Sequence, residues 1–192
     1  KQRYRLLLFA KQNGMSYTPE RIFRVGDGGP SSTNLSAGGN VFTHGLHKKG
    51  DFGLQNVRSS GRGRSYRFTF IKIPSSEVFD NIVYVSKKYR YLKMFLPISR
   101  LWTVIAKKYE QLSPELASTY VGYCEEDRVL ARPAQLPPSL VTIMLKYANR
   151  YYFQTSGSHV YAIRRAKMPL YKEKNLRELL AVAEEMRKAL SN

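Results

Sequence analysis

Tyr66-Arg67-Phe68-Thr69-Phe70-Ile71-Lys72-Ile73 is the stretch from which the fold of this chain is most readily predicted. Aromatic and β-branched residues dominate it, and Pro74 follows, so the pattern predicts a β-strand that ends at the proline. Residues 81–86 read as the next strand, and residues 89–96 as a third after a tight polar turn at Lys87-Lys88. Turns this short join antiparallel neighbours, because parallel strands need long crossovers.

The apolar spacing changes to a helical period on the C-terminal side of these strands. Residues 98–112 predict an amphipathic helix with Pro97 near its start and Pro114 just past its end. Its apolar positions are Ile98, Leu101, Trp102, Ile105, Tyr109 and Leu112. The last element, residues 172–190, predicts a second helix whose apolar face contains Leu176, Leu179, Leu180, Ala183, Met186 and Leu190.

More strand-like runs lie between the two predicted helices, at residues 116–123, 128–132 and 140–147. Residues 151–155 and 159–164 predict a hairpin that turns at Ser156-Gly157-Ser158. Strands closed by a helix, twice over, favour an α+β fold with two antiparallel sheets, each followed by a helix. We expect residues 1–192 to form a single domain.

The N-terminal third is less regular. Residues 3–9 fit either a short strand or the end of a helix. Residues 26–63 are rich in Gly, Ser and Asn, which predicts a flexible segment with short strands at residues 40–43 and 53–57. This segment is either a basic arm that orders on phosphates or a mobile linker.

Charge is the strongest functional signal. Lys and Arg number 32 against 14 Asp and Glu, which gives a formal net charge of +18. The basic residues are spread along the chain and interleaved with aromatics, a composition that favours a nucleic-acid partner, namely single-stranded or locally unpaired RNA. A membrane surface is an alternative, but neither predicted helix has a uniformly basic polar face, and no apolar run reaches the roughly 20 residues of a membrane span.

Two strands are predicted to present cations and rings together. Lys87, Tyr89, Tyr91, Lys93 and Phe95 share one face of residues 89–96 and its preceding turn, and Arg64, Tyr66, Phe68 and Lys72 share one face of the first strand. The alternative is that the rings pack under a helix. Lys146, Arg150, Arg164, Arg165 and Lys167 form a second basic cluster, either a rim contact or solubility charge. The predicted RNA contacts are Arg62, Arg64, Tyr66, Lys72, Lys87, Lys88, Tyr89, Arg90, Tyr91, Lys93, Lys146 and Arg150.

No pattern in the sequence predicts catalysis, a metal site or a cofactor. His44 and His47 have no cysteine or carboxylate at ligand spacing. Residues 125–127 are acidic and read as a solvated turn. Cys124, the single cysteine, adjoins acids that disfavour its thiolate, and it permits no intramolecular disulfide.

The basic strand block 66–96, the helix from Pro97 bearing Trp102, the block 140–164 and the C-terminal helix resemble the mitochondrial guide-RNA-binding proteins of trypanosomatids, which share the Whirly fold. The Lys-Gly-Lys-Ala-Ala-type motif of plant Whirly proteins does not occur in this sequence. The resemblance implies a mitochondrial tetramer of two related chains. It also implies a non-enzymatic role, in which guide RNA is held with its bases exposed and anneals to pre-edited messenger RNA.

Two other functions remain as alternatives to an RNA-annealing protein. A structural mitochondrial ribosomal protein would use the same charge against a fixed rRNA surface. An RNA-processing enzyme such as a nuclease would need clustered carboxylates or a histidine pair on the basic face, and the 14 acids show no such cluster in the sequence.

Overall fold

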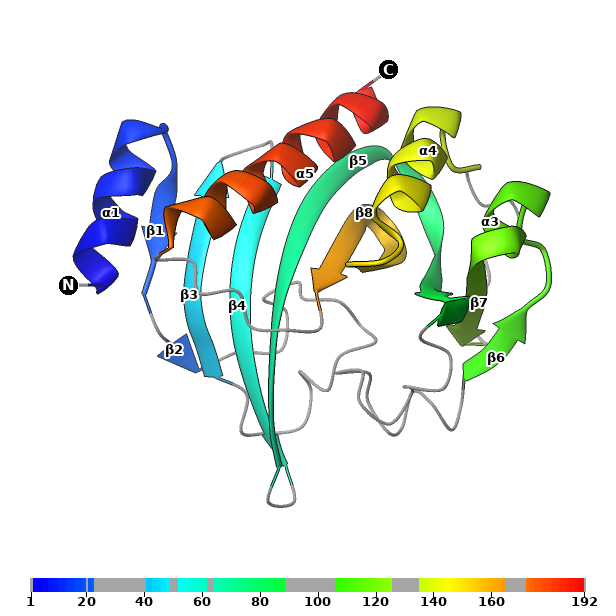
Figure 1. The fold of residues 1–192 in the computed structure, drawn as a ribbon, viewed down its shortest axis with the longest axis horizontal. Helices are drawn as coiled ribbons and strands as arrows, with labels where there is room; N and C mark the ends of the chain where they lie inside the picture. The colour runs from blue at the N-terminus through cyan, green and yellow to red at the C-terminus, as the bar shows by residue number, and fades with distance from the viewer. Residues whose placement is uncertain are drawn as a thin grey trace.

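The computed structural model describes residues 2–19, 21–22, 41–48, 52–61, 64–88, 106–125, 135–164 and 172–191 (Figure 1). In chain order the elements are α1 (Gln2–Gln12), β1 (Ser16–Thr18), β2 (Arg21–Ile22), β3 (Val41–Lys48), β4 (Phe52–Gly61), β5 (Arg64–Ser86), β6 (Ala106–Tyr109), α3 (Pro114–Thr119), β7 (Tyr120–Glu125), α4 (Pro138–Tyr147), β8 (Tyr152–Arg164) and α5 (Glu173–Ser191). The strands pair antiparallel, which confirms the predicted α+β class.

The described strands form one eight-stranded sheet built around β5. The order is β1-β3-β4-β5-β7-β6, with β2 added to β3 and β8 added to β5. β8 pairs with both halves of β5, whereas β4 pairs with its first half and β7 with its second. The prediction of two separate sheets, each followed by a helix, therefore differs from the structure, because β5 is shared by all of these strands.

β5 continues through Pro74, where the sequence predicted its end. Its pairing with β8 shifts register between Pro74 and Phe79 and again before Ile82, and Gly157 of β8 lies opposite Phe79 with φ 55. Such irregularities bend a strand without ending it, and the positive φ explains the glycine. The predicted hairpin at residues 156–158 is thus wrong. The turn-like residues mark the place where two paired strands bend together (Figure 1).

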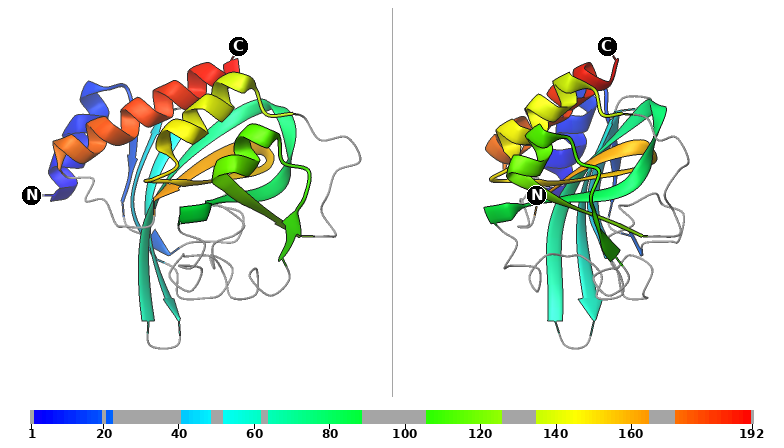
Figure 2. Two further views of the ribbon diagram at one scale, coloured as in Figure 1. Left: turned by 45° about the vertical axis from the view of Figure 1, so that its right-hand side comes forward. Right: turned by 90° about the vertical axis from the view of Figure 1, so that its right-hand side faces the viewer.

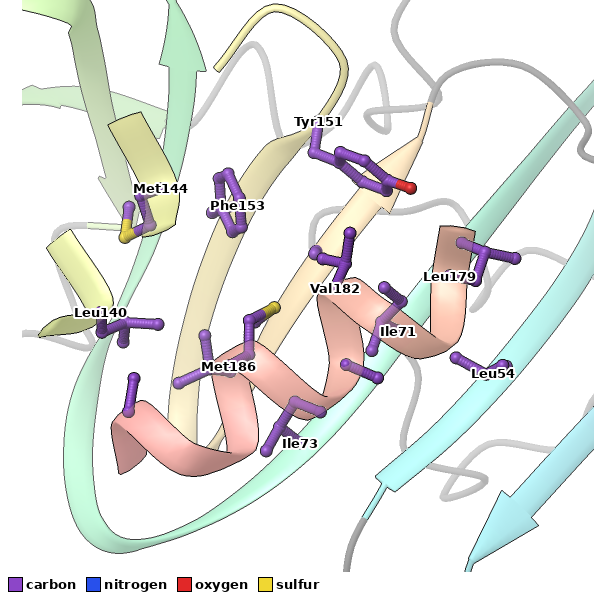
Figure 3. Close-up of a cluster of buried hydrophobic side chains, with 14 of the residues drawn as sticks. Leu54, Ile71, Ile73, Leu140, Met144, Tyr151, Phe153, Leu179, Val182 and Met186 are labelled. Atoms are coloured by element: carbon purple, nitrogen blue, oxygen red, sulfur yellow. The ribbon is translucent and has the colours of Figure 1, made fainter. Parts of the chain in front are cut away.

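α4 and α5 cover one face of the sheet (Figure 2). The predicted C-terminal helix is confirmed, and α5 buries Leu176, Leu179, Val182, Ala183, Met186 and Ala189. In Figure 3, Leu179, Val182 and Met186 lie over Leu54 of β4 and Ile71 and Ile73 of β5. Burying this apolar stripe is the main local reason for the fold, since each fully buried aliphatic side chain contributes about 1.5–3 kcal/mol.

The prediction of a strand at residues 140–147 is wrong, because this segment is helix α4. Pro138 occupies the first turn, where a missing N–H costs nothing. Leu140, Val141 and Met144 are buried on one side at helical spacing. The β-like composition is outweighed by tertiary packing against α5 and Phe153 (Figure 3).

The predicted elements around Pro114 are displaced. Ala106–Tyr109 form strand β6 in place of the end of the predicted helix 98–112, and residues 98–105 lie outside the described residues. The predicted strand 116–123 begins instead with helix α3, which Pro114 opens and Ser113 caps by accepting a hydrogen bond from the Leu116 amide. Pro114 therefore lies at the start of α3, whereas the sequence predicts that it follows the end of helix 98–112.

The N-terminal region contains more regular structure than the sequence predicted. Residues 3–9, for which the sequence allows a short strand or the end of a helix, lie within helix α1. β4 includes the short strand predicted at residues 53–57, and β3 contains residues 41–43 of the one predicted at residues 40–43; both strands are longer than predicted. The predicted strands 89–96 and 128–132 lie outside the described residues.

Candidate nucleic-acid interface

The predicted RNA contacts fall into three groups in the structure. Arg62, Tyr89, Arg90, Tyr91 and Lys93 lie outside the described residues. Arg64, Tyr66 and Lys72 are on β5, and Lys87 and Lys88 directly follow it. Lys146 and Arg150 are on and just after α4, far along the chain from the others.

The first half of β5 keeps the alternation that the sequence predicted. Its register with β4 is unbroken from Lys72, opposite Gly53, to Arg64, opposite Gly61. The backbone positions of Arg64, Tyr66 and Lys72 are therefore on one face of the sheet. The Lys72 side chain is half-buried, and burial lowers its pKa.

The rings beside Lys72 are sealed. Tyr161 of β8 pairs with Lys72, and its ring meets that of Phe70 edge-on at 6.1 Å between centroids. Phe70 is 0% exposed and Tyr161 3% exposed, and burial raises the pKa of Tyr161 to about 12. Neither of these two rings is placed to stack on a base. They were not among the predicted contacts, and the side chains of Tyr66 and Phe68, which were part of the predicted surface, are outside what the structure describes.

A histidine adjoins this group. His159 of β8 lies two residues before Tyr161, with 6.2 Å between ring centroids. Burial, and then the charge of Lys72, lower the pKa of His159. The face opposite α5 therefore brings Lys72 near enough to His159 for the lysine charge to disfavour protonation of the imidazole, an effect that a nearby anion would offset.

Lys87 and Lys88 directly follow the last residue of β5. Both side chains are exposed at the end of β5, whose preceding residues Val85 and Ser86 are buried. No carboxylate of the described residues forms an ion pair with either lysine. A buried strand thus ends in two adjacent, hydrated cations.

The cluster near α4 is different because its cations already have anionic partners on α5. Lys146 Nζ donates to both carboxylate oxygens of Glu185 at 2.8 Å, which raises the pKa of the lysine. Glu178 accepts from Arg164 at 2.6 Å and from Arg150 at 3.4 Å. The structure therefore brings Lys146 and Arg150 to the α5 helix, away from the strand cations.

One basic surface was missed by sequence reasoning. Arg5 and Lys11 are exposed on α1, a helix that contains no acidic residue. The sequence signal for this helix is the pair of apolar residues Leu6 and Ala10, four positions apart. Both are buried in the structure.

The described residues contain no group of three His, Cys, Asp or Glu side chains placed to hold a metal ion. Cys124 is a free, buried thiol on β7, 7% exposed. Among the described helices, none combines the length and the apolar character that crossing a bilayer requires.

No protein-family model matches the chain, and no curated protein matches it. A solved structure to which it is similar is the mycobacterial trehalose monomycolate transport factor A, TtfA. The identity is 14%, the TM-score is 0.48, and the match covers 98% of this chain and 94% of that one. A similarity of this size carries no argument about function.

Proposed function

We propose that this chain is a non-enzymatic RNA-binding protein that holds single-stranded RNA mainly through its phosphates. Contacts to phosphate carry no sequence information, so binding is expected to be salt-sensitive and nearly independent of sequence. Neutralised phosphates also remove the repulsion between two strands, while the base edges stay free to pair.

The uneven distribution of charge carries this proposal. In residues 1–76, Lys and Arg outnumber Asp and Glu by 13 to 3. Three of the four acids of α5, by contrast, pair with cations on or just after α4, on β8 and on α5 itself. The net charge of +18 therefore belongs mostly to the rest of the molecule, where Lys87 and Lys88 are exposed.

The resemblance to trypanosomatid guide-RNA-binding proteins narrows the proposal. It makes guide RNA the ligand, annealing to pre-edited messenger RNA the activity, the mitochondrion the compartment and a tetramer with a related chain the assembly. The described strands form one hydrogen-bonded sheet, not a Whirly-like pair of sheets. The proposal rests on the distribution of charge and does not require such a pair.

The test compares two cations that have no anionic partner among the described residues with a cation that has one. The double variant Lys87→Gln/Lys88→Gln should weaken binding of unrelated single-stranded RNAs by about tenfold at low salt. It should also reduce the slope of log affinity against log salt by about 1.4, because each phosphate contact to a single strand contributes about 0.7. Fluorescence anisotropy at several salt concentrations measures both quantities.

Lys146→Gln is the matched control, because this lysine is equally exposed but already bonded to Glu185. Its effect on affinity and on the salt slope should be much smaller. Losses in proportion to the number of charges removed, with Lys146→Gln losing half as much of the salt slope as the double variant, would show that only total charge matters. An unchanged salt slope in the double variant would remove the end of β5 from the binding surface, and a protein that aggregates without RNA would favour the ribosomal alternative.

A further inference from the structure

The first helix, α1, is apolar on two sides. Leu6 and Ala10 are buried in the core, at 0% and 1% exposure. Tyr4, Leu7 and Leu8 are exposed, at 69%, 54% and 43%. At 3.6 residues per turn, positions 4, 7 and 8 form one stripe on the side opposite positions 6 and 10. One apolar side of α1 is therefore covered by the core and the other is open to water, and an exposed apolar patch of this kind indicates a further binding surface.

This stripe is unusual within the molecule. Among the described residues, the exposed large apolar side chains are Tyr4, Leu7, Leu8 and Val78, and Val78 alone of these lies outside α1. Figure 1 shows α1 at one end of the molecule beside β1, whereas β5 ends near β7 at the other end. The stripe is therefore a concentrated patch of the kind that marks a membrane or protein contact, and it is separate from Lys87 and Lys88.

Cations border the stripe. Arg3 and Arg5 lie on either side of Tyr4, about 100° away in each direction around the helix, and Lys11 extends the stripe by one turn. All three are exposed, and α1 contains no acidic residue. A partner for this face must accept positive charge and apolar side chains together.

Charge complementarity selects among the possible partners. A second copy of the same face would bring Arg5 and Lys11 against their equivalents. An RNA strand would neutralise the cations but leave Leu7 and Leu8 in water. An anionic lipid surface meets both requirements, because headgroups attract the cations and the acyl boundary accepts the leucines, with the Tyr4 ring at the interface.

We propose that α1 docks the folded protein onto an anionic lipid surface, with Tyr4, Leu7 and Leu8 inserted at the level of the headgroups. This goes beyond RNA binding, and it revises the expectation that membranes are not a partner. That expectation rests on the polar faces of the two helices predicted at residues 98–112 and 172–190, and it does not apply to α1. The helix lies in the plane of the interface, so it needs no membrane-spanning length.

The experiment is vesicle flotation with the 192-residue chain. One vesicle type contains phosphatidylcholine alone, and the other adds about 30% phosphatidylserine to create a negative surface potential. The wild type should float with the anionic vesicles and much less with the neutral ones. The double variant Leu7→Gln/Leu8→Gln should bind the anionic vesicles about tenfold more weakly or worse, because it removes apolar surface from the membrane contact. Arg5→Gln should reduce binding by about fivefold.

Val78→Gln is the matched control, since it removes an exposed apolar side chain of similar size, 51% exposed, far from α1. It should bind vesicles as the wild type does, and all variants should melt within a few degrees of the wild type. Equal vesicle binding by the Leu7/Leu8 variant and Val78→Gln would overturn the proposal, as would failure of the wild type to bind. A matching loss of RNA affinity in the Leu7/Leu8 variant would assign the face to RNA and also overturn it.

Discussion

The first and last helices, α1 and α5, both pack against the core but differ in the side that they expose. Each buries one apolar side in the common core. α5 then presents a polar side on which Glu173, Glu178 and Glu185 form ion pairs. α1 presents apolar side chains and cations with no acidic residue. The difference shows that stability is concentrated around α5, while α1 has a surface that folding alone does not explain.

Shortening one leucine on each helix tests most directly whether α1 and α5 differ in their contribution to stability. Leu179 of α5 is 0% exposed, and Leu179→Ala should lower the free energy of unfolding by about 2–5 kcal/mol, through lost burial and the cavity left over Ile71 (Figure 3). Leu7→Ala on α1 should change it by no more than about 0.5 kcal/mol, because the side chain is half-exposed. Urea unfolding measures both.

The result for Leu7→Ala can also contradict this difference between the helices. A loss for Leu7→Ala that approaches the loss for Leu179→Ala would mean that Leu7 packs against part of this chain in solution. The exposed stripe of α1 would then belong to the fold, and the contrast between the helices would disappear.

A smaller effect tests the charges of α5. Glu178→Gln keeps the side-chain shape but removes the anion that accepts from Arg164 at 2.6 Å and Arg150 at 3.4 Å. Because both Glu178 and Arg164 are about three-quarters buried, at 25% and 27% side-chain exposure, the loss should be about 1 kcal/mol. Glu184→Gln, an exposed glutamate on the same helix, is the control and should be nearly neutral. Equal unfolding curves for the two variants would show that these ion pairs contribute nothing measurable.

The regions that the sequence predicted well are those where one local signal agrees with the tertiary packing. The apolar positions of α5 recur at helical spacing, and the same positions are buried in the core. The alternation along Arg64–Ile73 likewise predicts the first half of β5 and its unbroken register with β4. In these two regions, local propensity and burial favour the same structure.

The wrong predictions come from residues whose local meaning depends on distant partners. Pro74 and Gly157 read as ends of strands, yet each lies within a long strand whose partner bends with it. Leu140–Tyr147 has the composition of a strand, but its contacts with α5 and Phe153 make it a helix. Composition contains no information on these contacts, which join residues far apart in the sequence.

The candidate site was predicted less well than the fold, for a related reason. The sequence shows that Lys87, Lys146 and Arg150 are cations, but not that Glu185 and Glu178 neutralise the second and third of them. The exposed leucines of α1 could not be identified either, because the sequence left residues 3–9 open between a strand and a helix. Charge is visible in a sequence, whereas its neutralisation and exposure depend on the fold.

The smallest expected effect extends the comparison to the sheet face opposite α5. Around α5 the cations have anionic partners, but on the other face Lys72 lies near His159, whose pKa is lowered by burial and by that lysine. The folded protein therefore binds fewer protons at His159 than the unfolded chain does, so stability falls as the pH drops through the ordinary histidine pKa of about 6.5 toward the lowered one. His159→Gln should remove part of this dependence in thermal melts between pH 8 and pH 5, and saturating RNA should reduce it if phosphate binds beside Lys72. Identical pH profiles for variant and wild type would show that His159 does not contribute to the pH dependence of stability, and would remove the effect of Lys72 on its protonation from this comparison.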